Sequence, residues 1–531
     1  MTASILLSEC LEMVFLCLLD ENHYTMSVKD LYPCTLVSRH WCRISTPFLY
    51  AYPFHHLVHS DSHITKFFKL IRTLLNCIPK SEIEQITSSN SSHLQKIFSR
   101  SNKKHSPSNI SLTFNYITFI RGLIFNEIFT DPYKLFNYQK IWSPPYIPKN
   151  HMSKSRFSKI SIPIMNHLFK TLCKNCNNLK RLAFTVQDND FFNTTIDILT
   201  FKDHNGRSKL CDLKELHYIS RYEIMMSSKD LYLTLLNDVC NLQLLCNEGI
   251  NSIEKANSIS QFISLQKKLE HVILSERCIR NNHNENYNIV LNSLSTQSKT
   301  LQKLNFTNLS FSKISDEVLE SLCSLNNIKE LKLRECKGLN DNLLPWAKSL
   351  TNLEVFELIL DEYTTFSKDF LIQLIHSSSN TLIKLIINYG RSNNQDYQLF
   401  QQIPNSLIHL ELPKIFPNEL ISIFKSCTRL TYFSTILSDD DCELWKENFK
   451  NLGKFIPKNL QKIQFKGMNN MMFNNDELKC FFEDCIINND SKLKYLEISG
   501  KLDVCQTYYD VAKEFGVKLT KRRNYLTIEN L

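Results

Sequence analysis

Glycine is scarce in this chain, with nine glycines in 531 residues, and no two of them lie closer together than Gly453 and Gly467. Phosphate-binding loops and nucleophile elbows need two or three glycines within a few residues, because the backbone must turn sharply and approach the ligand. The sequence therefore contains no G-x-G-x-x-G, Walker A or G-x-S-x-G motif. No histidine is followed by glutamate, which excludes the H-E-x-x-H zinc helix. We expect a protein without enzymatic activity.

A long apolar run and a basic N-terminal region are also missing. No uninterrupted apolar stretch is long enough to span a membrane. The stretch Leu11–Leu19 is similar to a signal-peptide core, but Glu12 interrupts it and the first basic residue after Met1 is Lys29. The 18 cysteines are scattered through apolar stretches, which favours reduced, buried thiols over a disulfide framework. The sequence predicts a cytoplasmic or nuclear protein without membrane association.

The composition is that of a folded chain, with 43% hydrophobic and 22% charged residues. The length exceeds what one ordinary domain needs, so we expect several parts or a repeat array. The formal net charge of +9 comes from 62 basic and 53 acidic residues. This excess is small for a chain of this length and does not by itself indicate nucleic-acid binding.

The first fifty residues show helical spacing of apolar side chains. Leu11, Val14, Phe15 and Leu18 follow the i, i+3, i+4, i+7 pattern, and Ser8 is a candidate N-cap. The sequence Ser27-Val28-Lys29-Asp30 has the form of a capping box, which predicts a second helical stretch. Apolar residues then recur at spacings of three and four, at Leu31, Cys34, Val37, Trp41, Ile44 and Phe48. These segments predict a small helical cluster that is short of core on its own.

This region resembles an F-box, a family with an L-P-x-E-x-L start, an apolar pair and an L-x-x-x-x-x-V-x-R-x-W end. The matching segments are Leu7-Ser8-Glu9-Cys10-Leu11, Val14-Phe15 and Leu31-x-x-Cys34-x-x-Val37-Ser38-Arg39-x-Trp41. The usual proline is replaced by Ser8, which also suits a helix start.

The resemblance implies a three-helix module that docks a Skp-family adaptor and, through it, a cullin and RING ligase core. The residues that it implies for this contact are Leu7, Leu11, Val14, Phe15, Leu18, Leu31, Cys34, Val37 and Trp41. The alternative is a plain helical cap packed on the segments that follow.

Residues 51–165 are less regular, and we interpret them as a linker. Phe67, Phe68, Ile71 and Leu74 indicate one amphipathic helix, and Ser- and Asn-rich stretches between residues 87 and 109 indicate a flexible insertion. Lys154, Arg156 and Lys159 form a short basic linker. The predicted division is an F-box at 1–50, this linker at 51–165 and repeats at 166–531.

Beyond residue 170 one phrase, L-x-x-L-x-L, recurs about every 28 residues. Its twelve copies are Leu179-Leu182-Phe184, Leu213-Leu216-Tyr218, Leu242-Leu245-Asn247, Leu269-Val272-Leu274, Leu301-Leu304-Phe306, Ile328-Leu331-Leu333, Leu353-Phe356-Leu358, Leu382-Leu385-Ile387, Leu407-Leu410-Leu412, Leu430-Phe433-Thr435, Leu460-Ile463-Phe465 and Leu493-Leu496-Ile498. The phrase places alternate side chains of a short strand inward, and the remaining residues return as a helix. One unit cannot bury its leucines alone, so neighbouring units must stack. The predicted fold is an α/β solenoid, a leucine-rich-repeat horseshoe with short parallel strands on its concave face and helices on its convex face.

Cysteines accompany several copies, as Cys176, Cys240, Cys336 and Cys427 do. These copies are similar to the degenerate, cysteine-containing leucine-rich repeats that often follow an F-box in large fungal families. Such cysteines would be small buried packing residues.

Two clusters raise the question of a metal. Cys173-x-x-Cys176 has no second pair at matching spacing, and Cys176 has a packing role in its repeat. His55, His59 and His63 could share a helix face, but no thiol or carboxylate completes that set except Asp61. We expect no metal and no cofactor.

The concave strand face carries charges of both signs. Its basic residues are Arg181, Lys303, Lys332, Arg334, Lys384, Lys462 and Lys466, and its acidic residues are Glu215, Glu248, Glu330, Glu357, Glu411 and Glu497. A phosphate-binding groove needs a consistent positive stripe, so we expect no nucleic-acid partner. Aromatic and aliphatic residues among these charges suit a protein partner, with Arg334, Val355, Glu357, Tyr432 and Tyr495 as candidate contacts.

Together these features predict the substrate-recognition subunit of a Skp–cullin–F-box ubiquitin ligase, whose substrates are directed to proteasomal degradation. Its contribution to the reaction would be proximity. A repeat scaffold that binds proteins without directing ubiquitination is the alternative. A repeat-fused enzyme ranks last, since residues 51–165 contain a single glycine, Gly122, and no recognised set of catalytic residues.

Overall fold

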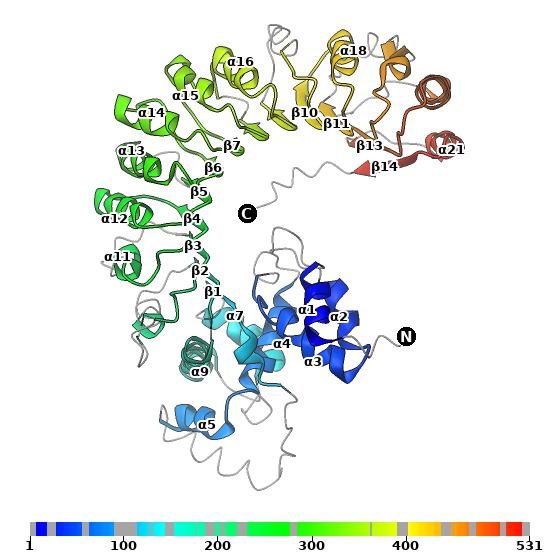
Figure 1. Cartoon of the computed structure of the whole chain (residues 1–531). Helices are drawn as coiled ribbons and strands as arrows, with labels where there is room; N and C mark the ends of the chain where they lie inside the picture. The colour runs from blue at the N-terminus through cyan, green and yellow to red at the C-terminus, as the bar shows by residue number, and fades with distance from the viewer. Residues whose placement is uncertain are drawn as a thin grey trace. The chain divides into compact units, whose positions relative to one another are not determined.

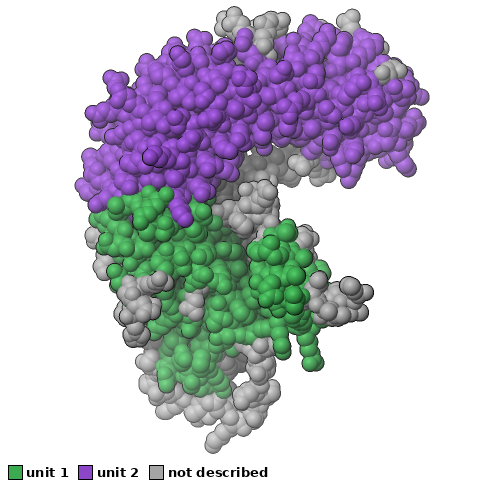
Figure 2. All heavy atoms as spheres, viewed as in Figure 1, with its two compact units in different colours: residues 1–248, 265–267 green, residues 249–264, 268–531 purple. Residues whose placement is uncertain are grey.

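The chain forms two compact units, residues 1–248 with 265–267 and residues 249–264 with 268–531 (Figure 2). The computed structural model describes residues 7–17, 28–55, 63–89, 114–126, 129, 131–143, 153–176, 178–185, 197–200, 202, 208–219, 231–276, 284–361, 364–389, 402–436, 448–449, 451–466, 474–499 and 506–522. Leu18, Ser27, His59 and Asp61 lie outside these ranges, as does most of the Ser- and Asn-rich stretch.

The first unit begins with three helices, which we call the N-terminal module: α1 (Ser8–Cys17), α2 (Val28–Thr35) and α3 (Arg39–Leu49). Its core consists of Leu11, Phe15 and Leu31, against which half-buried apolar residues of α2 and α3 pack. The Phe15 ring meets Trp41 edge-on at 5.7 Å between centroids. Ser38 caps α3, because its Oγ accepts a hydrogen bond from the Trp41 amide at 3.2 Å.

The remainder of the first unit alternates helices with four parallel strands. In chain order the elements are α4 (Ile64–Leu75), α5 (Lys80–Ser89), η3 (Tyr116–Phe119), β1 (Gly122–Asn126), α7 (Pro132–Asn137), α8 (Gln139–Trp142), α9 (Lys154–Asn175), β2 (Arg181–Thr185), β3 (Glu215–Ile219), α11 (Leu231–Leu235) and β4 (Leu244–Glu248). The helix that the apolar spacing predicts around Phe67 is α4.

Two segments of the predicted linker have regular structure. The basic stretch that includes Lys154 and Lys159 is the start of α9, because apolar residues at helical spacing continue the pattern as far as Leu172. Strand β1 pairs in parallel with β2, Leu123 opposite Leu182. The repeats therefore begin earlier than residue 166, at a copy of the phrase formed by Ile120, Leu123 and Phe125.

Ala51 joins the N-terminal module to the first strand. In this sheet the residue before most strands donates its amide to the equivalent carbonyl of the preceding repeat, as Lys180 does to the Arg121 carbonyl at 2.7 Å. Arg121 in turn donates to the Ala51 carbonyl at 2.7 Å, and Gly122 donates to the same oxygen at 3.0 Å. Ala51 thus takes the place of a preceding repeat and covers the edge of β1, which would otherwise leave donors unpaired.

The second unit contains ten parallel strands, β5 to β14, joined by helices. Its strands are β5 (His271–Ser275), β6 (Lys303–Thr307), β7 (Glu330–Arg334), β8 (Val355–Ile359), β9 (Lys384–Asn388), β10 (His409–Lys414), β11 (Tyr432–Ile436), β12 (Lys462–Lys466), β13 (Tyr495–Ser499) and β14 (Lys518–Arg522). Its helices are α12 (Ile253–Ser264), α13 (Asn284–Ser293), η5 (Leu294–Gln297), α14 (Asp316–Cys323), η6 (Asp341–Leu343), α15 (Leu344–Ser349), α16 (Lys368–Ser377), α18 (Pro417–Ser426), η8 (Gly453–Phe455), α20 (Asn475–Phe482), η9 (Glu483–Asn488) and α21 (Gln506–Glu514). Within this unit the helices lie on one side of the sheet, and the other side is its open face (Figure 1).

In β5 to β13 the second and fourth residues of each strand point toward the helices and are buried, as Leu331 and Leu333 are in β7. The first, third and fifth residues lie on the open face. All twelve predicted copies of the phrase coincide with strands, β2 to β13, which confirms the predicted α/β solenoid. The phrase misses β14, because Gly516 and Lys521 replace two of its apolar positions.

The cysteines that the repeats carry are free thiols. Cys176, Cys336 and Cys427 are buried, as predicted, and Cys240 is half-buried. No helix within the described ranges is long and apolar enough to cross a membrane.

Candidate functional site

The N-terminal module exposes an apolar surface. Of the large hydrophobic side chains that are exposed in the described part of the chain, half belong to α1, α2 and their adjoining residues. We call them the apolar surface of the module, and they are Leu7, Met13, Val14, Leu16, Tyr32, Leu36 and Val37. Such a concentration on two short helices is typical of a surface that a partner covers.

The nine residues that the F-box resemblance implies for adaptor binding do not lie together. Leu7, Val14 and Val37 are 69%, 43% and 52% exposed. In contrast, Leu11, Phe15 and Leu31 are buried at 0%, 0% and 1% exposure. Cys34 and Trp41 are half-buried against this core, and Leu18 lies outside the described residues. The buried three hold the helices together beneath the surface, because an i, i+3, i+4 stripe marks the face that a helix buries.

Met13, Leu16, Tyr32 and Leu36 are exposed residues that the F-box resemblance does not include. They do not belong to the apolar stripe of their helices, and only their exposure in the structure identifies them as candidate contacts. Large apolar residues at positions where an amphipathic helix normally carries polar ones are the signal that could have identified them.

On β6 to β8 the charges of the open face pair with one another, both within a strand and between neighbouring strands. Lys303 Nζ lies 3.3 Å from Glu330 Oε2, and Lys332 Nζ lies 2.5 Å from Glu330 Oε1. Burial raises the pKa of Glu330, but the hydrogen bonds and charges of the two lysines outweigh it and the net pKa is lowered. Arg334 Nε donates to Glu357 Oε1 at 2.7 Å, and the Glu357 side chain is 6% exposed. Two predicted contacts, Arg334 and Glu357, are therefore one ion pair across β7 and β8.

A larger set of polar contacts, which we call the Tyr432 network, covers β10 to β13. The Tyr432 ring stacks on His409 at 4.2 Å between centroids. Its hydroxyl donates to Gln464 Oε1 at 2.7 Å, and Gln464 Nε2 donates to Glu497 Oε1 at 3.0 Å. Lys462 Nζ lies 2.7 Å from the other oxygen of Glu497. The Tyr432 ring is held in one position by these contacts.

The second half of the Tyr432 network is centred on Glu411. His409 Nε2 lies 3.1 Å from its Oε1, and Lys466 Nζ lies 2.8 Å from its Oε2. Burial raises the pKa of the Glu411 carboxyl, but the hydrogen bond from His409 and the charge of Lys466 outweigh it and lower the pKa to about 2. Glu411 is therefore ionised at neutral pH.

The five predicted substrate contacts fall into two groups on the open face. Arg334, Val355 and Glu357 lie on β7 and β8, with Val355 half-buried. Tyr432 lies on β11 and Tyr495 on β13, with Lys462 between them in the strand register. Tyr495 is 44% exposed, which makes it the more accessible of the two rings.

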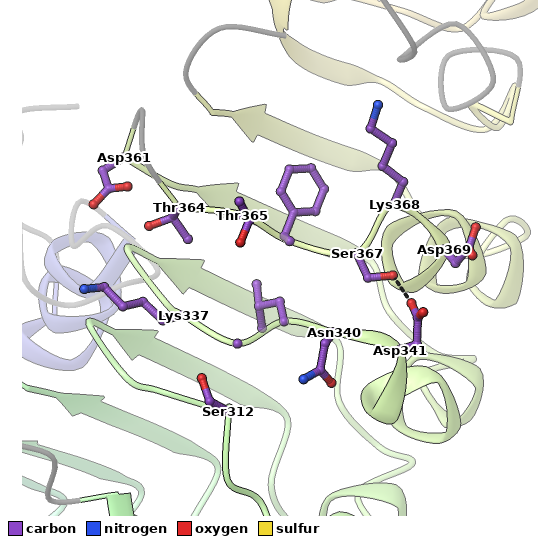
Figure 3. A pocket seen from close by; sticks show the side chains of 13 residues that line it. Ser312, Lys337, Asn340, Asp341, Asp361, Thr364, Thr365, Ser367, Lys368 and Asp369 are labelled. Atoms are coloured by element: carbon purple, nitrogen blue, oxygen red, sulfur yellow. Dashed lines mark hydrogen bonds between the residues drawn. The ribbon is translucent and has the colours of Figure 1, made fainter. Parts of the chain in front are cut away.

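A hollow of about 700 Å³ lies among the loops that follow β6 to β8 (Figure 3). Gly338 (φ +70°) approaches Ser312 here, since a Cβ on Gly338 would lie 2.3 Å from the Ser312 amide nitrogen. Ser367 donates to Asp341 across the hollow. The charged residues of its lining are of both signs: Lys337, Lys368, Asp341, Asp361 and Asp369. Most of its lining residues belong to loops without a periodic pattern, so the sequence does not predict this hollow.

Of the candidate metal residues, the structure describes Cys173, Cys176, His55 and His63, whereas His59 and Asp61 lie outside the described residues. Cys173 and Cys176 are buried, and burial raises the pKa of both thiols, that of Cys176 to about 12. The His55 ring is buried and meets Tyr52 edge-on at 5.6 Å between centroids. Among the residues that the structure describes, no group of three or more His, Cys, Asp or Glu side chains could hold a metal ion.

Comparison with known proteins gives distant structural similarity. No family model matches the chain, and no curated protein sequence matches it. The leucine-rich repeat-containing protein LegL7 from Legionella pneumophila is similar with 15% identity and a TM-score of 0.34, over 63% of this chain and 97% of that one. A chain of the yeast Rad7 and Elc1 complex is similar with 15% identity and a TM-score of 0.37, over 66% of this chain and 76% of that one. The assignment of the solenoid fold rests on the strand register of this chain.

Proposed function

We propose that this protein is a non-catalytic substrate receptor of a cullin-based ubiquitin ligase. The apolar surface of the N-terminal module would dock a Skp-family adaptor and, through it, the cullin and RING core. The open face of the repeats would bind a protein substrate for ubiquitination and proteasomal degradation. The protein would act in the cytoplasm, the nucleus or both.

The observation that carries this proposal is the apolar surface itself. Seven large apolar side chains of α1, α2 and their adjoining residues are exposed over a core of only three buried residues. A module with so small a core gains stability when a partner covers this surface. The resemblance of these residues to an F-box supports a Skp-family adaptor as that partner.

The open face supports the second half of the proposal. Tyr432 and Arg334 are fixed by ion pairs and hydrogen bonds within the sheet, so little side-chain entropy is lost when a partner contacts them. Tyr and Arg are also the residues that most often dominate binding energy at protein interfaces.

The experiment is a pull-down of the full-length protein with the Skp-type adaptor of the same cell. The test variant is Val14→Glu/Val37→Glu, which adds charge to two exposed apolar positions and leaves the core unchanged. We expect capture to fall by about tenfold or more, because charges at an apolar interface are buried without partners. Leu11→Asp is a poor test, since it would unfold the module.

The matched control is Lys66→Gln/Lys69→Gln on α4, where both lysines are exposed. It lowers the net charge by the same amount and should capture adaptor like the unmodified protein. Equal capture by the Val14→Glu/Val37→Glu variant and the unmodified protein would contradict the proposed docking surface.

One observation favours the alternative, a repeat scaffold that is not coupled to ubiquitination. The Ala51 carbonyl covers the edge of β1, which is the role of a helical cap at the end of a solenoid. This function would take the lead if the unmodified protein, shown to be folded, captured no adaptor.

A further inference from the structure

The open face of β9 to β14 carries more basic than acidic side chains. Its charged residues, apart from Arg522 at the end of β14, are five lysines and two glutamates: Lys384, Lys414, Lys462, Lys466, Lys518, Glu411 and Glu497. The sequence phrase assigns neither Lys414, which follows a bulge in β10, nor Lys518, which lies on β14. The near balance of charge that the sequence suggests for the whole face therefore does not hold on these six strands.

The two glutamates are already neutralised and lie deep in the face. Glu497 is 3% exposed and Glu411 is 21% exposed. Each has a lysine within 2.8 Å, Lys462 for Glu497 and Lys466 for Glu411. A partner that approaches this face therefore meets lysine side chains before it meets a carboxylate.

Lys384 and Lys518 stand at the two ends of this surface, on β9 and β14. Within the described ranges neither of them forms an ion pair. Lys518 is exposed and Lys384 is half-buried. Both are first residues of their strands, so they lie in one row with Tyr432 and Tyr495.

Apolar groups lie between the lysines. Ile386 and Ile436 are half-buried on the open face, and Tyr495 is 44% exposed. Aliphatic and aromatic anchors among cations suit a polypeptide that alternates acidic and aliphatic side chains. Six strands at about 4.8 Å spacing span about 24 Å, the length of about seven extended residues.

We propose that the open face of β9 to β14 binds an extended acidic segment of a partner protein, with carboxylates on the Lys384 to Lys518 row and aliphatic side chains against Ile386 and Ile436. This inference deepens the proposed function, since it gives the chemical class of the recruited substrate. The proposed peptide site is separate from the adaptor surface, because the adaptor surface belongs to the N-terminal module.

A peptide fits these observations better than a nucleic acid does. The paired carboxylates of Glu411 and Glu497 lie in the middle row of the face, where an oligonucleotide backbone would meet them. Ile386 and Ile436 offer aliphatic contact rather than the stacking platform that single strands use.

The test measures fluorescence anisotropy of a fluorescein-labelled peptide of Glu-Glu-Leu-Ser repeats with the full-length protein. We expect binding that weakens with salt. The variant Lys384→Glu/Lys518→Glu should weaken it by about tenfold or more, because it replaces two attractive contacts by repulsive ones. The control, Lys479→Glu/Lys513→Glu on α20 and α21, makes the same change of net charge at exposed helix positions. It should change the affinity by less than about twofold.

Three outcomes would overturn the proposal: equal binding of a Gln-Gln-Leu-Ser peptide, equal weakening by both double variants, or tighter binding of a single-stranded oligonucleotide than of the acidic peptide. Thermal melts of both variants establish that they are folded. Because the peptide assay contains no adaptor, its failure is distinguishable from failure of the adaptor pull-down.

Discussion

Lys466 on β12 reaches across the intervening strand β11 to place its Nζ 2.8 Å from Oε2 of Glu411 on β10. This contact ties together three consecutive repeats, whereas most contacts in a solenoid join only neighbours. His409 binds the other oxygen of the same carboxylate at 3.1 Å. Glu411 therefore links β10 to β12 through one carboxylate oxygen while His409 binds the other.

We predict that the Glu411→Gln variant loses stability at neutral pH but not in acid. The pKa of Glu411 is lowered from 4.5 to about 2 in the folded state, so the unfolded chain binds the proton more tightly. The stabilisation is therefore fully present above about pH 4.5 and is lost as the pH falls toward 2. Its upper limit is about 3 kcal/mol.

The measurement is urea denaturation of both proteins at several pH values. The difference in unfolding free energy should narrow steadily below pH 4.5. Glu354→Gln is the control, since Glu354 pairs with Lys329 at 3.1 Å with both side chains about half exposed; it should cost under about 1 kcal/mol. A difference between Glu411→Gln and the unmodified protein that stays constant with pH would contradict the role of the Glu411 charge.

A second prediction concerns two glycines with the same backbone conformation. Gly338 (φ +70°) would place a Cβ 2.3 Å from the Ser312 nitrogen, whereas Gly516 (φ +71°) has nothing within 4 Å. Gly516→Ala should cost about 1 kcal/mol, for the left-handed conformation alone. Gly338→Ala should cost about 1–3 kcal/mol more, because the backbone of Ser312 must move. Thermal unfolding of the two variants compares them, and equal costs would argue against the close approach.

The junction between the N-terminal module and the first repeat gives a third prediction. A Cβ on Gly122 would lie 2.5 Å from Tyr52 Cδ1 and 2.7 Å from His55 Cε1. Gly122→Ala should therefore lower the unfolding free energy by about 1–3 kcal/mol. Limited proteolysis should cut the variant faster near residue 52. Adding Tyr52→Ala makes room for the methyl group, so the double variant should lose less stability than the two single changes sum to.

Thiol reactivity gives a fourth prediction. Burial raises the pKa of Cys173 and Cys176, so neither forms a thiolate at pH 8. Iodoacetamide should label the exposed Cys10, Cys17 and Cys480 in the folded protein and reach Cys173 and Cys176 only after denaturation. Peptide mass spectrometry identifies the labelled positions.

The thiols of Cys173 and Cys176 are predicted to bind no metal. EDTA should therefore leave the melting temperature unchanged, and stoichiometric zinc in the purified protein would contradict this prediction.

Most of the repeats could be predicted, because nearly every repeat buries the three apolar positions of the L-x-x-L-x-L phrase, one just before its strand and two within it. Leu331 and Leu333 are an example: the spacing of these two leucines predicts a strand and shows which of its faces is buried. Ile120, Leu123 and Phe125 have the same spacing and mark β1, in a region where the less regular surroundings predict a linker. The phrase does not mark β14, where Gly516 takes an apolar position.

The candidate surfaces were less predictable for a physical reason. Helical periodicity identifies what a helix buries, so it selected Leu11 and Phe15, which form the core, and passed over Met13 and Leu16, which are exposed. On the open face the phrase assigned the charged residues of β2 to β13 except Lys414, but which of these charges pair depends on which strands are neighbours. That Arg334 and Glu357 bind each other follows only from the register of β7 and β8.

The Ala51 carbonyl has a mechanical consequence. A flexible tether between a docking module and a binding surface gives an effective concentration that its length and entropy determine. Here the amides of Arg121 and Gly122 donate two hydrogen bonds to the Ala51 carbonyl, so the module is not connected to β1 by a flexible tether. Whatever binds the module is then joined to the first strand through a hydrogen-bonded segment of backbone. Removing the module together with Ala51 would also remove this acceptor from the edge of β1, so a chain truncated there would be an unreliable trap for substrates.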